Sequence, residues 1–469
     1  MTKKLAPLSL AMVAMLAGCS MIPAYERPAA PVPTNYTAAS VQTGAPLPSW
    51  RNYFSEPRLQ QLIELALDHN RDLRIASLNV EQARAQFQVR RAAQYPAVGL
   101  AANASRAPAS GSGDLTNSFS VGLAVTAWEL DFFGRVASLK EQALAHYLAS
   151  EEGRNAAQVS LISAVANGWL TLLADEQLLE LSRQTLATRE ESVRLTKLRL
   201  DSGAASELDY RQAESLTQAA RATLAQQQRQ RALDENALAL LLGQPLPEDI
   251  RASLSRSDLR AAPSMQAIPA GLPSDLLAQR PDIRQAEQQL VAANANIGAA
   301  RAAFFPRIAL TAQAGTASGE LSGLFKNGSW GFTLAPSLLL PLFDAGANQA
   351  NLDSAQVGRK LAVAQYEKSI QTAFREVSDA LASQSTLTEQ LDAQTKQAEA
   401  EAIRLNLADL RYKNGVASYL DLLDAQRSRF STQQGVVQVR LGQLQNQVTL
   451  FKALGGGWDA QTAPTTKAH

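Results

Sequence analysis

The sequence predicts a membrane protein of mixed α and β structure, in which each of two structural repeats supplies a β-hairpin and a long helical hairpin. Three observations support this fold class. The chain repeats its motifs after about 210 residues, each half contains two segments in which apolar residues alternate with small or polar ones, and each half contains about sixty consecutive residues without proline. Alternation with period two is typical of strands, and long proline-free stretches favour helices.

The repeat is clearest in two pairs of motifs. "LRLDSGAASELDYRQAE" (Leu198–Glu214) is similar to "LRYKNGVASYLDLLDAQ" (Leu410–Gln426), 212 residues later. "AAQYPAVGLAA" (Ala92–Ala102) is similar to "AAFFPRIALTA" (Ala302–Ala312), 210 residues later. Collinear matches at nearly one offset indicate two copies of the same series of elements.

The first twenty residues predict an exported protein with a lipid anchor. Lys3 and Lys4 form a basic segment, residues 5–17 form a short apolar one, and Cys19 is the only cysteine. This pattern is typical of a signal peptide and not of a spanning helix. Because Leu16 to Cys19 resembles a bacterial lipobox, we expect covalent lipid (palmitate included) on Cys19, with a proline-rich extended linker after it.

Four alternating segments predict transmembrane strands of about ten residues each, a sufficient length for a tilted strand. Two begin near residues 97 and 307, and the other two place large apolar residues on one face: Phe119, Val121, Leu123 and Val125, then Trp330, Phe332, Leu334, Pro336 and Leu338. A sheet in a bilayer cannot leave an open edge, and bacterial barrels begin at eight strands. The chain must therefore oligomerise. A dimer would give eight strands, and a trimer twelve with room for a lumen. The soluble alternative, a small sandwich with a helical stalk, leaves the apolar outward face unexplained.

A long helix follows each predicted β-hairpin, over residues 137–200 and 348–412. Apolar residues in the first step by three and four, as in a coiled coil: Val159, Ile162, Ala166, Trp169 and Leu173. Sixty residues of α-helix measure roughly 90–100 Å, which no compact domain needs. A return helix then extends to about Leu242 and Leu454.

These elements define the predicted boundaries along the chain. In order, we expect a signal peptide (1–18), a lipidated N-terminal linker (19–57), repeat 1 (58–243, with its β-hairpin at about 97–130), an inter-repeat segment (244–281), repeat 2 (282–454, with its β-hairpin at about 307–340) and a C-terminal tail (455–469).

The order of these elements, written twice behind a lipobox, resembles the TolC/NodT-type outer-membrane efflux factors. The most specific piece is "GLPSDLLAQRPDIRQAE" (Gly271–Glu287), similar to a stretch typical of the lipoprotein branch that serves RND drug-efflux pumps. "WELDFFGR" (Trp128–Arg135) is similar to the family's segment between strand and long helix. Locally, we expect Asp282 to cap the next helix.

The resemblance implies a homotrimer with a twelve-stranded β-barrel in the bacterial outer membrane, continuous with an α-helical coiled-coil barrel in the periplasm. It implies a periplasmic adaptor (membrane fusion) protein and an inner-membrane RND-type transporter as partners. The function expected is a passive exit channel of a tripartite efflux system for drugs and other small molecules, associated with multidrug and antibiotic resistance. Protein secretion or metal-ion efflux is the alternative within this class.

Two other classes of protein, an enzyme and a structural lipoprotein, explain the sequence less well. An enzyme has no support, because no catalytic constellation, phosphate loop or metal-ligand spacing occurs, and we expect no cofactor besides the lipid. The net charge of +1 gives no indication of a nucleic-acid surface. A structural coiled-coil lipoprotein would explain the helices and the anchor, but not the alternating strands.

The repeated turn is where we expect a periplasmic gate, at the end of the long helices farthest from the barrel. Gly203 and Gly415 suit a left-handed helix stop. Asp209 and Asp421 complete sequences that resemble capping boxes, so both carboxylates are explained as helix caps. Asp424 is not explained as a helix cap, because it lies one helical turn beyond Asp421 on the same face of the helix.

By resemblance, Asp421 and Asp424 match the acidic positions that ring the family's periplasmic aperture, and Tyr412 matches a tyrosine that helps to hold it closed. Carboxylates from three chains, about 4–6 Å apart, would repel one another and favour cation passage.

A residue that locks the closed gate is also expected. Ala417 stands where one relative has a locking arginine, so other residues must act. Our hypothesis is that Arg411 or Lys413 pairs with Asp201 or Asp209 of the neighbouring hairpin.

Overall fold

The computed structural model describes residues 20–33, 36, 47–108, 115–254, 259, 265, 276 and 279–458. The signal peptide and the predicted lipidation site Cys19 lie outside these residues. The chain divides into two compact units, and each unit contains segments from both halves of the sequence. Unit 1 comprises 1–29, 77–152 and 283–369, and unit 2 comprises 30–76, 153–282 and 370–469.

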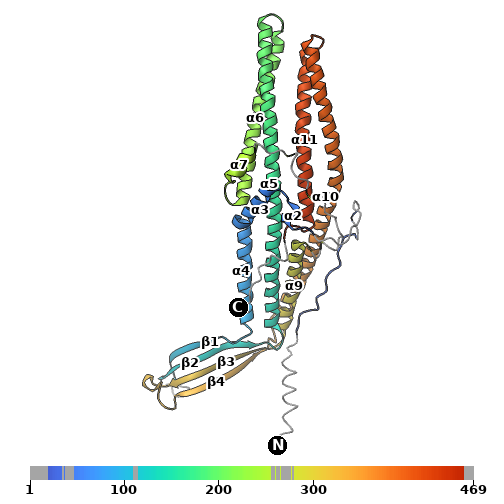
Figure 1. The fold of residues 1–469 in the computed structure, drawn as a ribbon. Helices are drawn as coiled ribbons and strands as arrows, with labels where there is room; N and C mark the ends of the chain where they lie inside the picture. Colours follow the sequence, from blue (N-terminus) through green and yellow to red (C-terminus); the bar gives the residue numbers. More distant parts are fainter. Residues whose placement is uncertain are drawn as a thin grey trace. The chain divides into compact units, whose positions relative to one another are not determined.

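Unit 1 contains one antiparallel sheet of four strands in the order β1-β2-β3-β4 (Figure 1). The strands are β1 (Val98–Pro108), β2 (Leu115–Leu130), β3 (Arg307–Ser318) and β4 (Trp330–Leu339). All four predicted strands are present. β2 is longer than expected, with 16 residues, and its pairing with β3 is interrupted by a bulge between Val125 and Trp128. The β2–β3 pairing joins the hairpin of one repeat to that of the other.

The register places the large apolar residues on one face of the sheet. Leu100 of β1 lies opposite Leu123 of β2, and Leu123 lies opposite Ala314 of β3, which pairs with Phe332 of β4. Apolar side chains of the sheet are more than half exposed: Val98, Leu100, Leu123, Trp330, Phe332, Leu334 and Leu338. An exposed apolar surface of this kind marks contact with lipid or another protein.

The long helices have nearly the predicted bounds. They are α4 (Arg71–Ala92), α5 (Arg135–Asp201), α6 (Glu207–Leu242), α9 (Pro281–Ala302), α10 (Ala347–Lys413) and α11 (Tyr419–Ala453). α5 and α10 each have 67 residues, about 100 Å of helix. Among the described helices, α5 alone is long and apolar enough to cross a membrane. Just over half of its apolar window, 56%, is buried, as in a core helix.

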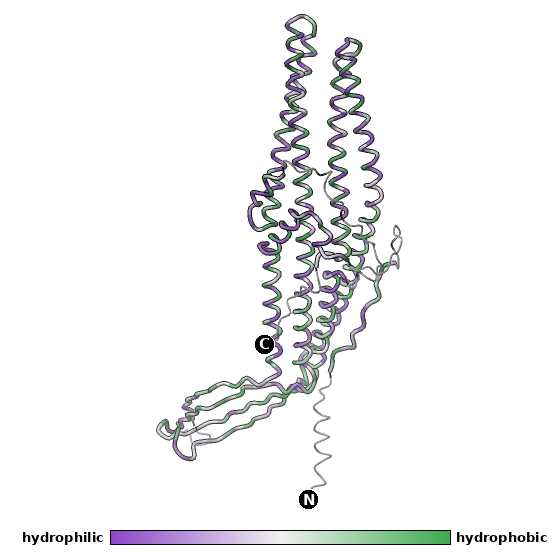
Figure 2. Tube along the Cα trace, viewed as in Figure 1, coloured by the Kyte–Doolittle hydropathy of each residue, from purple (hydrophilic) through white to green (hydrophobic). Residues whose placement is uncertain are grey.

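Polar and apolar residues are interspersed along these helices (Figure 2). In unit 2 the predicted seam of α5 is buried, and Ala166 and Trp169 are completely inaccessible to solvent. The core also includes Phe451 of α11, which stacks on Tyr53 with ring centroids 4.1 Å apart. α6 completes this core with Leu238 and Leu242.

The expectation of a simple linker over residues 19–57 is wrong for its last part. A short helix, α2 (Trp50–Tyr53), precedes α3 (Pro57–His69), and the side chains of Trp50, Tyr53 and Phe54 are at most 5% exposed. Three large aromatic side chains in five residues bury enough apolar surface to order this segment. A second short helix, α7 (Glu248–Leu254), lies in the predicted inter-repeat segment.

The prediction that Asp282 caps a helix is also wrong. α9 begins at Pro281, so Asp282 lies inside its first turn and accepts hydrogen bonds from Arg280 at 3.0 and 2.6 Å. Proline is favoured at the first helical position because it needs no hydrogen-bond donor there. The helix therefore begins two residues earlier than the capping pattern suggested, at Pro281 instead of Ile283.

The first helical hairpin contains a pair of carboxyl groups, of which one is buried and the other half-buried. Asp175 of α5 is 5% exposed and lies beside Asp234 of α6, with Arg231 and Glu176 nearby. Burial, then the hydrogen bond and the charge of Asp234, raise the pKa of Asp175 to about 7. At the equivalent positions of the second repeat, 212 residues later, stand Leu387 and Asn446, so this pair belongs to one repeat only.

This pair predicts that stability falls as pH rises. The pKa of Asp175 rises from 3.8 in the unfolded chain to about 7 in the folded one, so the folded state binds more protons between these values. The resulting loss of stability begins near pH 4 and is complete above pH 7. We expect Asp175→Asn to be more stable than the parent protein at pH 8, by on the order of 2 kcal/mol, and equally stable near pH 4.

Thermal unfolding followed by circular dichroism at both pH values measures this difference. Glu180→Gln is the matched control, because Glu180 lies on the same helix with its side chain 55% exposed. An equal effect of Asp175→Asn at both pH values would contradict the assignment.

Candidate gate at the helical hairpin turns

The two helical turns of unit 2 have the same backbone geometry. In the first, Gly203 has φ +74°, its N–H donates to Leu200 O at 2.9 Å, and the Ala204 N–H donates to Arg199 O at 2.7 Å. This pair of hydrogen bonds is the Schellman motif, which requires a left-handed residue and so favours glycine.

The second turn repeats each feature. Gly415 also has φ +74°, its N–H donates to Tyr412 O, and the Val416 N–H donates to Arg411 O, both at 3.0 Å. The two copies of the sequence motif therefore encode one local structure, as the repeat predicted.

Asp209 and Asp421 are helix caps. The Ser206 hydroxyl accepts from the Asp209 N–H at 3.1 Å, and the Asp209 carboxylate accepts from the Ser206 N–H at 3.1 Å. Ser418 and Asp421 form the same capping box at 3.2 and 3.1 Å. Both carboxylates are thus engaged by their own helix starts, which supports the cap explanation for these two residues.

Asp424 has different partners. It forms ion pairs with Arg404 of α10 and, at 3.3 Å, with Arg427 of α11. Arg404 also forms an ion pair with Glu401, with 3.1 Å between Nη1 and Oε2. The hydrogen bond from Arg404 is the main cause that lowers the pKa of Asp424, so this carboxylate is charged at neutral pH and partly neutralised within its own chain.

Tyr412 links the two helical hairpins. Arg199 of α5 donates from Nη1 to the Tyr412 hydroxyl at 2.6 Å, and its guanidinium lies 5.0 Å from the centre of the Tyr412 ring. Beside it, the rings of Tyr412 and Tyr419 are 5.5 Å apart, and the Tyr419 hydroxyl is 2.9 Å from Ser192 Oγ of α5. A small apolar cluster supports these contacts: Ala213, Tyr419, Leu422 and Leu423.

The candidate lock residues make no contact between the hairpins of one chain. Lys413 pairs with Asp409 at 2.6 Å and Asp201 with Lys197 at 2.7 Å, each pair on one helix. Arg411 is exposed and forms no ion pair with any described residue. A pair between chains stays a prediction.

Arg199, Tyr419 and Ser192 were not predicted from the sequence, although the repeat contained a signal for Tyr419. Tyr412 and Tyr419 stand where the first repeat has Leu200 and Glu207, so the two turns differ at the residues that connect them. Substitutions between otherwise similar repeats indicate positions that contact the other copy.

The turns bring together guanidinium groups, phenols and carboxylates in exposed hydrogen bonds. Among the described residues, no group of three or more His, Cys, Asp or Glu side chains could hold a metal ion. Such contacts break and form reversibly at small cost, because exposed pairs contribute little stability. The arrangement therefore suits a conformational switch better than a chemical reaction.

A sheet with an exposed apolar face, joined in the chain to paired helices of about 100 Å, defines a membrane channel subunit. Comparison with known proteins agrees. A family model described as "Outer membrane efflux protein" matches residues 62–244 and 272–456. The chain belongs to this outer membrane efflux protein family, whose members are outer-membrane transport components and not enzymes.

Individual relatives cover nearly the whole chain. The "Probable efflux pump outer membrane protein TtgC" of Pseudomonas putida is 46% identical, over 98% of this chain and 97% of its own. The "Outer membrane protein OprJ" of Pseudomonas aeruginosa is 45% identical, over 95% and 94%. The crystal structure of the open state of the Neisseria gonorrhoeae MtrE outer membrane channel matches with a TM-score of 0.85 and 42% identity, over 94% and 98%.

Proposed function

We propose that three copies of this chain form one twelve-stranded barrel and one helical tunnel, which together give small molecules an exit across the outer membrane. The observation that carries the proposal is the four-stranded sheet. Its edge strands β1 and β4 have no further partner in the described chain, and its apolar face is exposed. Such a sheet must close with strands of other copies before it can lie in a bilayer, and three copies leave a lumen.

The proposed partners are a periplasmic adaptor and an inner-membrane transporter of the RND type. Support comes from the relatives, which are named as efflux pump proteins for antibiotics, toluene and solvents. We propose drugs and comparable small apolar molecules as the substrates, with lipid on Cys19 as a second attachment to the outer membrane.

The stoichiometry and the transport function are tested separately. Native mass spectrometry of the purified protein should give the mass of three chains, and a two-chain mass would overturn the twelve-stranded barrel. Deletion of the gene should increase sensitivity to antibiotics and toluene, and re-expression should restore tolerance. Crosslinking in cells, followed by copurification, should capture an adaptor. Unchanged sensitivity to every compound would contradict drug efflux and favour secretion or metal-ion efflux.

The gate is the second part of the proposal. In a closed trimer, six turns with one backbone geometry would surround the periplasmic mouth. Arg411 occupies the place in the second repeat that Arg199 occupies in the first, 212 residues earlier. Within one chain Arg199 bonds to Tyr412, but the residue equivalent to Tyr412 in the first repeat is Leu200, which has no hydroxyl. Arg411 would therefore pair with the adjacent Asp201 of the neighbouring chain.

Conductance tests the contact within the chain. Tyr412→Phe removes the acceptor of the Arg199 hydrogen bond and keeps the ring, so we expect the closed state to be weakened and the resting conductance in planar bilayers to rise roughly three- to tenfold. Tyr210→Phe is the matched control, because the Tyr210 ring also lies under an arginine, at 5.3 Å, and its hydroxyl bonds to no described residue. Equal conductance of both variants would contradict the assignment.

The contacts between chains need their own variants. Substitution of both Arg411 and Lys413 by alanine should raise resting conductance if they lock neighbouring chains, and unchanged conductance would exclude that lock.

Because Asp424 is partly neutralised by Arg404, we expect Arg404→Ala to increase cation preference and block by divalent cations, whereas Asp424→Ala should lower both. No response to either change would exclude an acidic ring at Asp424.

A further inference from the structure

The N-terminal segment, residues 20–29, has no regular secondary structure, yet it is held along α9 in unit 1. Successive contacts run antiparallel to the helix, since residues nearer the N-terminus contact residues later in α9. The contacts are Arg27 with Glu287 at 2.6 Å, the Pro23 carbonyl with Asn294 Nδ2 at 2.8 Å, and the Met21 carbonyl with Arg301 Nη1 at 3.4 Å. The segment has therefore one direction and one register on the helix.

The strongest of these contacts is the pair of Arg27 and Glu287. Arg27 donates from Nε and Nη2 to the two oxygens of Glu287, at 2.7 and 2.6 Å, and Tyr25 donates its hydroxyl to the same carboxylate at 3.1 Å. The Glu287 side chain is only 12% exposed. A bidentate pair of this kind adds geometric specificity to the attraction.

Gly298 of α9 allows the closest approach. A Cβ at this position would lie 2.7 Å from Ile22 Cγ1, 3.0 Å from the Ile22 nitrogen and 2.6 Å from Ser138 Oγ in the first turns of α5. Ile22 is thus packed at the start of α5 and near the end of α9, where a larger residue than glycine would displace it.

The segment leads towards the junction of helix and sheet. Arg301, the contact of Met21, lies in the last turn of α9, which ends at Ala302, and β3 begins at Arg307. Two residues of extended chain span at most about 7 Å. Cys19 precedes Met21 by two residues, which limits its distance from Met21 to this span.

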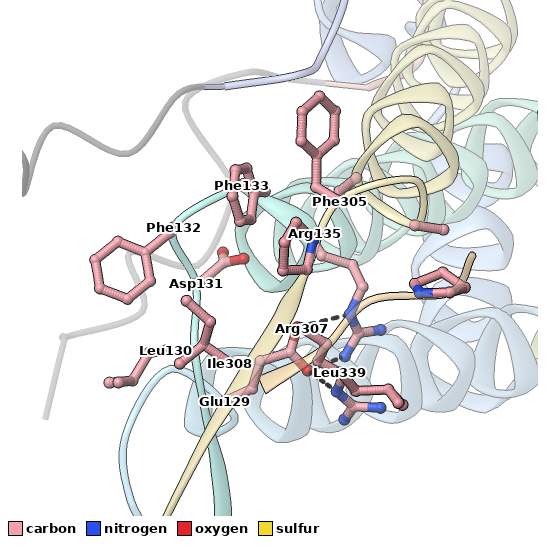
Figure 3. Close-up of a pocket in the computed structure, with 14 residues that line it drawn as sticks. Glu129, Leu130, Asp131, Phe132, Phe133, Arg135, Phe305, Arg307, Ile308 and Leu339 are labelled. Atoms are coloured by element: carbon pink, nitrogen blue, oxygen red, sulfur yellow. Dashed lines mark hydrogen bonds and ion pairs between the residues drawn. The ribbon is translucent and has the colours of Figure 1, made fainter. Parts of the chain in front are cut away.

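A groove of about 240 Å³ lies at the junction, between the end of β2, the end of α9 and the start of β3. We call it the junction groove. Its apolar wall includes Phe132, Phe133 and Phe305, and the rings of Phe133 and Phe305 stack with centroids 4.9 Å apart. Figure 3 shows these rings on one side of the groove and the Glu129–Arg135–Arg307 group on the other. Phe132 and Phe305 are 43% and 40% exposed, so the apolar wall is accessible.

We propose that the aromatic wall of the junction groove binds an acyl chain of the lipid on Cys19. This rests on lipidation of Cys19, which belongs to the proposed function above. The N-terminal segment acts as a fixed tether of about two residues, so it delivers the lipid to this wall at a high effective concentration. The lipid then lies against the protein and the anchor is part of the folded structure. The groove is lined mainly by the β2–α5 and α9–β3 connections, and the edge strand β4 contributes only Leu339.

The competing occupant is a phospholipid of the surrounding membrane. An exposed aromatic group at a membrane interface also contacts bulk lipid, without any tether. The two sources share their chemistry, but only the tethered chain remains covalently attached to the N-terminal peptide.

Photocrosslinking of the intact lipoprotein in cells separates the two. A benzophenone amino acid at position 132 should give a crosslink between its peptide and the acylated N-terminal peptide, identified by mass. At position 343, where the side chain is 90% exposed, the same group should give phospholipid adducts only. The crosslink from position 132 should disappear in Cys19→Ser. Phospholipid adducts alone at position 132, or an unmodified Cys19 in the parent protein, would overturn the proposal. Neither outcome affects the efflux measurements.

The tether itself is tested with Arg27→Ala, which removes the bidentate contact and leaves Cys19 and the groove intact. We expect the yield of the N-terminal crosslink from position 132 to fall roughly threefold or more. Arg51→Ala is the matched control, because Arg51 is similarly exposed (58% against 51%) and has a single ion pair, with Glu64. An equal yield in both variants would show that the segment does not position the lipid.

Discussion

Replacement of Gly315 by alanine should prevent assembly of the proposed barrel and reduce the assembled protein in the outer membrane by at least roughly tenfold. Gly315 of β3 lies directly opposite Gly122 of β2. A Cβ at Gly315 would lie 2.2 Å from the Val121 carbonyl oxygen and 2.4 Å from the Gly122 Cα, and a Cβ at Gly122 would lie 2.4 Å from the Ala314 carbonyl oxygen. Every one of these neighbours is a backbone atom, so no side-chain rotation relieves the clash.

The effect is large because of where this pair lies. The β2–β3 pairing is the one that joins the hairpins of the two repeats within the described sheet. Overpacking usually costs about 1–3 kcal/mol, and here the strands must separate before the methyl group fits. A factor of ten in assembly corresponds to only about 1.4 kcal/mol.

The amount of assembled protein in outer-membrane fractions, compared by electrophoresis without and with heating, measures this effect. Gly331→Ala in β4 is the matched control. Gly331 lies opposite Gly315 on the other side of β3, and a Cβ there meets nothing within 4 Å. If Gly315→Ala assembled as well as Gly331→Ala, the close approach of β2 and β3 would not be required.

The elements of the fold could be predicted from the sequence because their signals are local. Alternation of residues determines which face of a strand is apolar, and the absence of proline from 137 to 200 permits an uninterrupted helix. The turns at Gly203 and Gly415 were predicted for the same reason, since a left-handed residue and a capping serine act within a few residues of chain.

Contacts between distant segments could not be predicted in the same way. Arg199 and Tyr412 are 213 residues apart, and their hydrogen bond depends on how the two helical hairpins are rotated about their axes. No local pattern encodes that rotation. The contact between Arg27 and Glu287 could not be predicted either. The sequence around Arg27 is rich in proline and predicts an extended linker, and nothing local indicates a partner on α9.

The gate is the clearest case of a partial prediction. Asp421 could be explained as a cap from the sequence, and the structure contains that capping box. Asp424 was distinguished from it by position alone. Its pairing with Arg404 could not be inferred, because Arg404 lies six residues before the repeated motif, on the opposite helix. The proposed acidic ring would therefore depend on charges that arginines of the same chain already offset in part.

The second large effect is expected for Arg280→Ala, which should destabilise unit 2 by about 2–3 kcal/mol and lower the amount of folded protein. The Arg280 side chain is 6% exposed and connects three segments of unit 2. It pairs with Asp282 in the first turn of α9 and with Glu376 of α10, at 2.6 and 2.8 Å, and it donates to the Ala453 carbonyl at the end of α11, at 2.8 Å. Its removal takes one charged donor away from each of two carboxylates and from a helix-terminal carbonyl.

The matched control for this prediction is Arg251→Ala. Arg251 also has two carboxylate partners, Glu235 and Glu248, but its side chain is 40% exposed, so water replaces the lost contacts and we expect at most about 1 kcal/mol. Loss of helical circular dichroism with increasing temperature measures both variants. Arg280→Lys separates charge from geometry: a lysine keeps the charge but has no planar fork to reach Asp282, Glu376 and Ala453 together, so it should recover only part of the stability. Two results would contradict this role of Arg280. One is parent-like stability of Arg280→Lys, and the other is an equal loss of stability in Arg280→Ala and Arg251→Ala.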